Sequence, residues 1–267
     1  MITILGPTAT GKTQVAVAVA QQLNGEIISA DSRQVFRRMT IGTGKDLDDY
    51  ILRSPDGQPL LDEQGEPRRI AHHLIDILEP GSRYSAAEYR ADFLRCYADI
   101  TGRGKEVIQC GGTGLYIESV LQGYAFEGSS RTAPEGQVPQ YSRSAAPRGP
   151  VFGLLVPRDV RRERITRRLH ARLHEGMVDE IQSLLDEGIT VDRMMRYGLE
   201  YKYVTLYCIG QLTYDDMVRQ LEIAIHQFAK RQMTWFRGME RRGITIHWID
   251  AMQPFDQRVE DILREVK

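Results

Sequence analysis

Cysteine and long apolar runs are both scarce in this 267-residue sequence. The first scarcity argues against a cysteine-based metal site, and the second against a membrane-spanning protein. The three cysteines, Cys96, Cys110 and Cys208, lack the spacing of a metal site, so buried free thiols in a reducing compartment are expected. No stretch approaches the ~18 apolar residues of a membrane-spanning helix. The first predicted core strand begins at Met1, which leaves no room for a cleaved targeting peptide. These absences favour a cytoplasmic protein without a membrane partner.

An excess of charge of one sign is also lacking. The net charge is −1, and the 42% apolar and 27% charged content are those of an ordinary globular protein. The overall balance therefore argues neither for nor against a nucleic-acid partner. The distribution is less even, because residues 131–172 contain ten arginines and only three acids. At this length we expect one large domain, or a core domain with a smaller lobe.

The first thirteen residues contain the clearest motif. An apolar run over residues 1–5 leads directly into Gly6-Pro7-Thr8-Ala9-Thr10-Gly11-Lys12-Thr13, which has the spacing of a phosphate-binding P-loop. In such a loop the backbone N–H groups converge on an anion, and a helix N-terminus points at it. Lys12 is expected to reach the phosphates and the Thr13 hydroxyl to hold Mg²⁺. A strand before the motif and a helix after it disfavour the alternative, a glycine-rich turn without a ligand.

A second buried strand is predicted over residues 26–30, and Asp31-Ser32-Arg33-Gln34 follows it. An open parallel sheet places its ligands at the carboxyl ends of its strands, so Asp31 is expected close to the P-loop. A carboxylate beside bound phosphates typically acts as a Mg²⁺ ligand or as a base. The alternative is a simple helix N-cap.

A third buried strand, residues 107–110, leads into the glycine-rich turn Gly111-Gly112-Thr113-Gly114. This turn lies at the same predicted sheet edge and can bring Thr113 toward the phosphates, opposite Lys12. Tight packing alone explains many such glycines, so the turn gains weight only beside the P-loop.

The second half of the chain is predicted to be mainly helical. Residues 126–150 are rich in Gly, Ser and Pro and are expected to form a linker, after which residues 151–156 resume the sheet. The longest helix is predicted over 213–241, and a strand over 244–249 closes the sheet. Near the end of that helix, cations interleave with aromatic side chains over Lys230–Arg237, and a similar cluster covers Tyr197–Lys202. Such clusters suit phosphates and stacked bases, although the cations over 230–237 also serve the helix C-terminus in part.

Together these motifs resemble the tRNA dimethylallyltransferase family, the bacterial enzymes that prenylate adenosine 37 beside the anticodon. The resemblance covers most of residues 1–125 and 151–250. It is carried, in family order, by the P-loop at 6–13, by 28–36, by Ile41-Gly42-Thr43-Gly44-Lys45, by His72-His73-Leu74-Ile75-Asp76, by 111–116 and by 230–237. The implied fold is α/β, a P-loop NTPase-like parallel sheet flanked by helices. Its core would consist of 1–125 and 151–267, joined by 126–150, with a helical C-terminal part.

The resemblance implies transfer of a dimethylallyl group from dimethylallyl diphosphate to N6 of adenosine 37, in tRNAs that read codons beginning with U. The P-loop would hold the diphosphate together with Mg²⁺. Lys12 would contact the phosphates, and the Thr13 hydroxyl would bind the Mg²⁺. Asp31 would accept the proton of N6, and Thr113 would contact the diphosphate or the adenine. The enzyme is expected to act as a monomer. Contacts to the tRNA anticodon stem-loop are implied for Asp31, Ser32, Arg33, Gln34, Thr113, Tyr197, Gly198, Leu199, Glu200, Tyr201, Lys202, Lys230, Arg231, Gln232, Trp235 and Arg237.

One departure from the family pattern concerns the middle of the chain. Family members carry a longer, largely helical insertion between the Gly111 turn and the strand at Val151, including an arginine-rich helix that touches tRNA. Here only residues 126–150 occupy that place, so we expect a shortened insertion and weaker tRNA binding. Two other enzyme classes stay open: prenylation of free adenine nucleotides, and a P-loop small-molecule kinase that consumes ATP. The P-loop, Asp31 and Thr113 together disfavour a non-catalytic RNA-binding protein.

Overall fold

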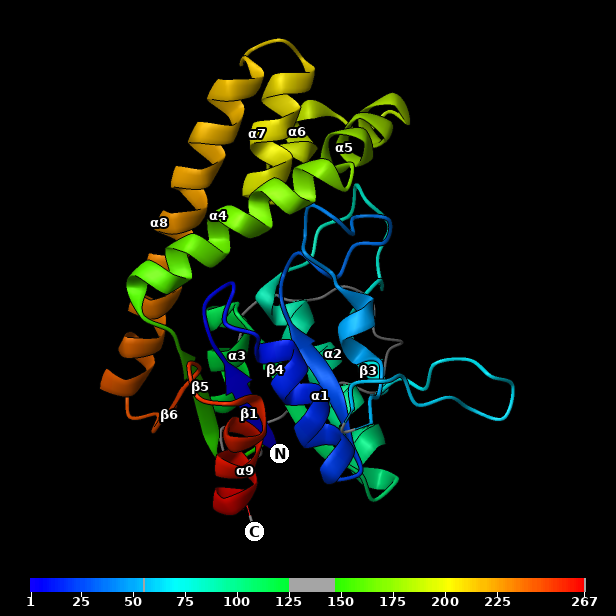
Figure 1. Ribbon diagram of the computed structural model, residues 1–267, viewed down its shortest axis with the longest axis vertical. Helices are drawn as coiled ribbons and strands as arrows, with labels where there is room; N and C mark the ends of the chain where they lie inside the picture. Colours follow the sequence, from blue (N-terminus) through cyan, green and yellow to red (C-terminus); the bar gives the residue numbers. More distant parts are fainter. Residues whose placement is uncertain (55, 125–146, 267) are drawn as a thin grey trace.

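A six-stranded sheet forms the centre of the computed structural model, which describes residues 1–54, 56–124 and 147–266. The strand order is β3-β2-β4-β1-β5-β6, and every pairing is parallel, which confirms the predicted α/β class (Figure 1). The strands are β1 Ile2–Leu5, β2 Gly25–Ala30, β3 His72–His73, β4 Glu106–Gly111, β5 Val151–Leu155 and β6 His247–Asp250.

Helices cover both faces of this sheet, which explains why the central strands are almost continuously apolar. Successive residues of a strand point to opposite faces, so Ile27 packs with α1 (Lys12–Gln22) and α9 (Phe255–Val266). Its neighbour Ile28 packs with α2 (Ala86–Gly102) and α3 (Gly114–Leu121) on the other face. Helix α2 begins with a capping box, in which Ser85 and Glu88 exchange side-chain and backbone hydrogen bonds.

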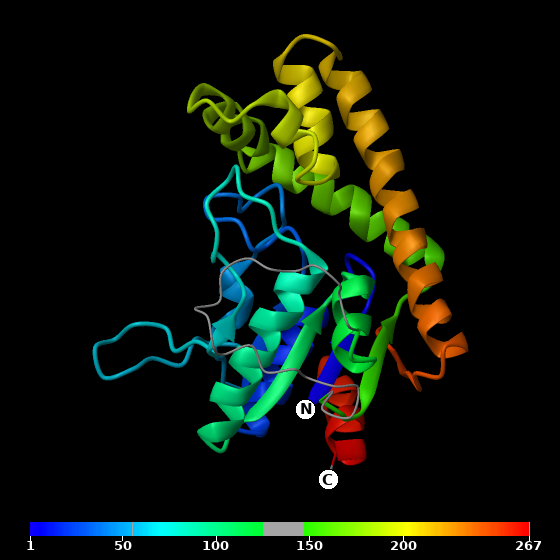
Figure 2. The ribbon, with the colours of Figure 1, turned by 180° about the vertical axis from the view of Figure 1, so that it is seen from behind.

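A separate helical layer lies over the carboxyl ends of the strands (Figures 1 and 2). It consists of α4 Arg158–His174, α5 Met177–Asp186, α6 Val191–Met194, α7 Leu199–Cys208 and the first half of α8 Tyr214–Arg241. Its own apolar core includes Ile165, Leu169 and Leu221, together with Phe36 and Met39 from the segment after β2. The layer is thus packed directly onto the loops that follow the strands.

The 28-residue helix α8 belongs to both parts of the molecule. Met217 and Leu221 near its start pack in the helical layer, whereas Met233 and Phe236 near its end pack against the sheet. Thr213 caps its N-terminus by accepting a hydrogen bond from the Asp216 N–H at 3.2 Å. The predicted boundaries of this helix are therefore confirmed.

Two connecting segments contain little regular structure. Residues 71–78 form only the two-residue β3, because Leu74 and Asp76 adopt positive φ and break the extended backbone. The loop before it projects from the molecule with isolated antiparallel bridges, as at Ile51–Arg69, and a short 3₁₀ turn, η1 (Leu47–Tyr50), precedes that loop. Most of the expected linker at 126–150 lies outside the described residues.

Within the described part of the chain, no helix combines the length and the apolar character needed to cross a membrane.

Candidate functional site

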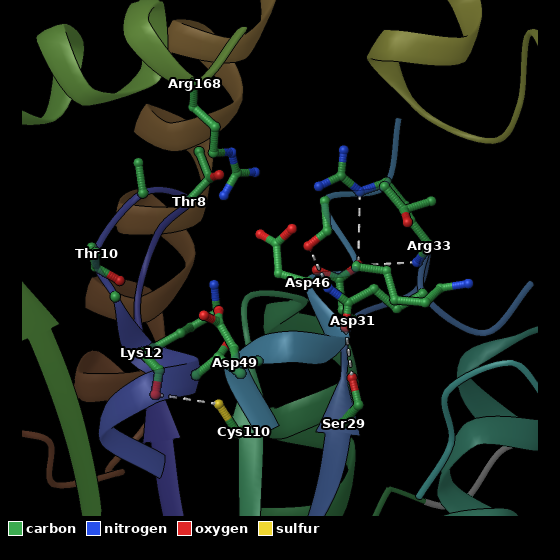
Figure 3. A pocket seen from close by; sticks show the side chains of 18 of the residues that line it. Thr8, Thr10, Lys12, Ser29, Asp31, Arg33, Asp46, Asp49, Cys110 and Arg168 are labelled. Carbon is green, nitrogen blue, oxygen red and sulfur yellow. Dashed lines mark hydrogen bonds and ion pairs between the residues drawn. The ribbon is translucent and has the colours of Figure 1, made fainter. Parts of the chain in front are cut away.

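The loops that follow β1, β2 and β4 meet at the carboxyl edge of the sheet and enclose a pocket (Figure 3). The P-loop forms one wall, and Asp31 with its neighbours forms another. The segment 43–50 closes the pocket from the side, while Arg168 of α4 and Gln232 of α8 reach it from the helical layer. The sequence prediction that the P-loop and Asp31 meet at one sheet edge is therefore confirmed.

The P-loop has the conformation that anion binding requires. Gly11 at the N-cap of α1 has φ 78° and Ala9 has φ 65°, which turns the backbone tightly around the pocket. The Thr10 hydroxyl donates to the Pro7 carbonyl at 3.0 Å and holds the turn. Because Gly11 has no capping side chain, the first N–H groups of α1 are left for an anion.

Two cations face this pocket without an acidic partner in the described part of the chain, Lys12 and Arg168. Burial lowers the pKa of both side chains. The guanidinium of Arg168 also lies against Gly44, where its Nη2 is 3.0 Å from the position of an added Cβ, so it is held over the pocket. Half-buried cations that form no ion pair favour binding of an anionic group.

Arg168 was not among the predicted site residues, although its helix was recognised as arginine-rich. The spacing of Arg164, Arg168 and Arg172 places them on one face of α4. That signal identifies a basic face, but only the packing of α4 over the strand ends shows that Arg168 points at the P-loop. Arg172 differs, because Asp46 and Glu175 neutralise it.

Asp31 is fixed by the residues that follow it. Its Oδ1 accepts a hydrogen bond from the Arg33 N–H at 3.0 Å, and the Arg33 Nη1 forms an ion pair with Glu200 at 2.8 Å. Burial alone would lower the pKa of Arg33, but the Glu200 and Asp31 carboxylates outweigh it and raise this pKa. No donor among the described residues contacts Asp31 Oδ2. That oxygen is available to accept a proton from a ligand in the pocket.

Thr113 joins the β4 turn to the Asp31 loop. Its Oγ1 accepts a hydrogen bond from the Ser32 N–H at 3.0 Å and lies 3.3 Å from the Ser32 hydroxyl. Thr113 is therefore held against the residue that follows Asp31, although it is not among the residues that line the pocket. Gln34, also predicted for the site, lines the pocket and donates to the Gly44 carbonyl at 3.3 Å.

Gln232 of α8 occupies a different position from the one expected. Its Oε1 accepts from the Thr8 N–H at 3.0 Å, and its Nε2 donates to the Gly112 carbonyl at 2.9 Å. The side chain is buried and connects the P-loop to the β4 turn. The amide is thus engaged between these two backbone groups, at a position that also lines the pocket.

Replacing Gln232 with leucine should lower the free energy of unfolding by about 1–3 kcal/mol for each backbone group left unpaired. The affected groups are the Thr8 N–H and the Gly112 carbonyl, both at buried positions. Urea unfolding would measure the change, and Gln227→Leu, at an exposed position of the same helix, is the matched control. Equal stability of the two variants would show that the bridge contributes little.

The remaining residues expected at an RNA surface fall into two groups. Lys230, Arg231, Trp235 and Arg237 are exposed along α8, and the Trp235 indole lies so close to Gly114 that a Cβ there would come within 2.2 Å. Among the residues of the other cluster, Tyr197 and Tyr201 are buried in the helical layer, which corrects the expectation that they contact RNA.

The buried cluster instead holds the wall of the pocket in place. The Tyr201 hydroxyl donates to Glu180 at 2.7 Å, and the same carboxylate accepts the N–H groups of residues 40, 41 and 42. Gly198 has φ 139° and packs against Arg33, Leu199 begins α7, and the Lys202 ammonium lies over the Tyr203 ring. Glu200 forms the ion pair with Arg33. Through the contacts of Gly198 and Glu200 with Arg33, this cluster fixes the loop that carries Asp31.

Comparisons with known proteins agree with this geometry. The family model described as IPP transferase matches residues 34–149 and 135–239, and that of isopentenyl transferase matches 1–54. A tRNA dimethylallyltransferase of Parabacteroides distasonis is 45% identical, with 99% of this chain and 96% of the relative covered. For one of Porphyromonas gingivalis the identity is 46%, with 99% and 98% covered.

Solved structures give the same result. The tRNA isopentenylpyrophosphate transferase of Staphylococcus epidermidis superposes with a TM-score of 0.78 at 28% identity, covering 99% of this chain and 98% of that one. The corresponding transferase of Bacillus halodurans gives a TM-score of 0.79 at 29% identity, covering 98% and 94%. With relatives this similar over nearly its whole length, this chain belongs to the IPP transferase family, the family of the tRNA dimethylallyltransferases.

Proposed function

We propose that this chain transfers the dimethylallyl group of dimethylallyl diphosphate to N6 of adenosine 37 in tRNAs that read codons beginning with U, and releases diphosphate. The observation that carries this proposal is one pocket in which the P-loop, together with Lys12 and Arg168, faces the Asp31 carboxylate, whose Oδ2 has no donor among the described residues. The first feature suits a diphosphate leaving group, and the second suits a base for an amine nucleophile.

The donor would lie with its diphosphate in the P-loop. As the allylic C–O bond breaks, negative charge develops on the diphosphate, and the N–H groups of residues 9–13, Lys12 and Arg168 are aimed at it. All of these groups are already in place around the pocket, so little reorganisation accompanies the reaction.

Magnesium fits the oxygen atoms that this pocket provides. Thr13, Asp31 and Asp49 line it, and burial raises the pKa of Asp49, which accepts a hydrogen bond from Gln14 at 3.1 Å. Within residues 1–54, 56–124 and 147–266, no cluster of three or more metal-ligating acidic, histidine or cysteine side chains occurs. We therefore assign Mg²⁺ to Thr13 and the Asp49 carboxylate, with diphosphate oxygens completing the ligand set. When bound, the ion would neutralise part of the leaving-group charge.

The acceptor adenine would approach from the side of Asp31 and Thr113. It must leave its stack in the anticodon loop, which costs a few kcal/mol that protein contacts offset. The exposed Trp235 beside Gly114 offers a stacking surface, and Lys230, Arg231 and Arg237 offer charges for backbone phosphates. Asp31 Oδ2 would then accept the N6 proton as the new C–N bond forms.

Every residue in this proposal belongs to one chain, so we infer that a monomer suffices. A tRNA substrate would also place the activity in the cytoplasm. We assign residues 1–125 and 151–267 to one core domain. The second of these ranges supplies the last strands of the sheet and the helical layer.

The proposal is tested by incubating the protein with dimethylallyl diphosphate, Mg²⁺ and unmodified tRNA, and then analysing tRNA digests by mass spectrometry. We expect N6-dimethylallyladenosine at position 37, and no steady phosphate release when ATP replaces the donor. Product on AMP but not on tRNA would assign the chain to free adenine nucleotides. Steady ATP turnover without prenyl transfer would assign it to the P-loop kinases.

A further inference from the structure

A buried carboxylate with no part in the chemistry proposed above lies where α3 meets the end of α8. Glu118 of α3 has only 1% of its side chain exposed, and it lies one turn after Gly114, the first residue of that helix. Its Oε2 accepts hydrogen bonds from the Trp235 indole Nε1 and from Arg242 Nη2, each at 2.9 Å. The Arg242 Nε donates to Oε1 and completes a two-point ion pair. One carboxylate therefore holds an aromatic side chain and a cation together.

These contacts fix the Trp235 indole at its five-membered ring. Glu118 holds the indole N–H, and the neighbouring Cδ1 lies so close to α3 that a Cβ added to Gly114 would come within 2.2 Å of it. The Arg242 guanidinium carbon lies 6.0 Å from the ring centroid of Trp235. Trp235 is nevertheless 40% exposed. The indole is thus anchored at one edge while much of its surface faces solvent.

The anchored indole adjoins the side of the pocket that carries the proposed base. Gln232, which lines the pocket, precedes Trp235 on α8 by one turn. Gly114 directly follows Thr113, whose Oγ1 accepts a hydrogen bond from the Ser32 N–H at 3.0 Å in the loop after β2. A single-stranded RNA loop that places one base in the pocket on this side would therefore bring a neighbouring base to the indole.

We propose that Glu118 is a positioning residue for the RNA substrate: it holds the Trp235 indole, backed by Arg242, as a preformed surface on which an unpaired base beside the modified one stacks. The inference rests on the proposed function. Proteins bind unpaired bases by stacking them on aromatic side chains. A side chain that is already fixed loses less conformational entropy when the base arrives. Because Glu118 neutralises Arg242, stacking and not charge is the attraction that this surface offers.

The fluorescence of Trp235 measures this contact without catalysis. The chain has two tryptophans, so Trp248→Phe leaves Trp235 as its only indole. In that background, titration with a synthetic anticodon stem-loop RNA should quench the fluorescence, because a base then stacks on the indole. The same titration gives the affinity for the RNA, and a separate titration with inorganic pyrophosphate and Mg²⁺ gives the affinity for the diphosphate.

Three variants in this background test the role of Glu118. Glu118→Leu should weaken RNA binding about fivefold and reduce the quench at saturation, since the indole N–H loses its acceptor and the ring its fixed position. Glu118→Gln keeps an acceptor for that N–H and should retain more of the affinity and of the quench. Gly114→Ala displaces the indole while Glu118 is intact, and should resemble Glu118→Leu. The affinity for pyrophosphate should stay at the wild-type value in all three.

Two matched controls should bind the RNA as the wild type does. Glu265→Gln removes a carboxylate from an exposed position of α9. Gly102→Ala adds a Cβ that meets no atom of the described residues within 4 Å. Thermal unfolding verifies the fold of every variant, and if Glu118→Leu fails to fold, Glu118→Gln and Gly114→Ala still decide the question.

Three results would overturn the proposal. Unchanged RNA affinity and quench in Glu118→Leu and Gly114→Ala would leave Glu118 a packing role only. Weaker RNA binding with an undiminished quench would assign the loss to Arg242 and RNA phosphates. Weaker pyrophosphate binding in these variants would assign the surface to the donor. The proposed function fails separately, when the wild-type protein binds the RNA and shows the quench but prenylates no tRNA.

Discussion

Replacing Asp31 with asparagine is expected to lower kcat for prenyl transfer by about 10²- to 10⁴-fold, the usual effect of removing a general base. Asparagine can keep the hydrogen bond from the Arg33 N–H, which Asp31 Oδ1 now accepts at 3.0 Å. It cannot accept the N6 proton in the way a carboxylate does. The fold and the affinity for diphosphate should therefore change little, whereas the chemical step is lost.

Single-turnover rates with saturating donor and tRNA would measure this effect directly. Asp48→Asn is the matched control, since the Asp48 carboxylate is 81% exposed and forms an ion pair with the exposed Arg69. Near-wild-type turnover of Asp31→Asn would restrict Asp31 to fixing the loop around Arg33, and another base would then be required.

Replacing Lys12 with methionine is expected to lower kcat/KM for dimethylallyl diphosphate by about 10²- to 10³-fold, the magnitude seen when one preorganised stabilising group is removed. Methionine retains the apolar stem, so the N-terminal turn of α1 should stay folded. The half-buried ammonium forms no ion pair with an acid among the described residues, and a bound diphosphate is the anion that would neutralise it.

Steady-state kinetics with varied donor would test this prediction, and pyrophosphate titration would separate binding from chemistry. Arg167→Gln also removes one positive charge, but from a side chain that is 71% exposed, and should have little effect. If Lys12→Met and Arg167→Gln behaved alike, the P-loop lysine would not contact the donor.

The central elements of the fold were predictable because their signals are local. The P-loop lies between a strand and a helix in the sequence, and the capping box at Ser85 and Glu88 identifies the start of α2 on its own. The meeting of Asp31 with the P-loop also follows from a general rule, since ligands bind at the carboxyl ends of parallel strands. These predictions needed no knowledge of long-range packing.

The rest depended on contacts between distant segments. Gln232 lies within a cationic stretch that suits RNA, yet the packing of α8 turns its amide inward to Thr8 and Gly112. Tyr201 suits a stacking surface by composition, but it is fully buried against the helical layer. Arg168 approaches the P-loop from a helix about 150 residues away, and sequence spacing alone gives no measure of such proximity.

The shared helix α8 has a thermodynamic consequence. Its outer face presents Lys230, Arg231 and Trp235, and its inner face holds the P-loop amide of Thr8 through Gln232. A rigid helix cannot shift under a bound tRNA without also shifting that amide. The free energies of donor and acceptor binding are then linked, and linkage is reciprocal: whatever factor bound diphosphate applies to the affinity for tRNA, bound tRNA applies to the affinity for diphosphate.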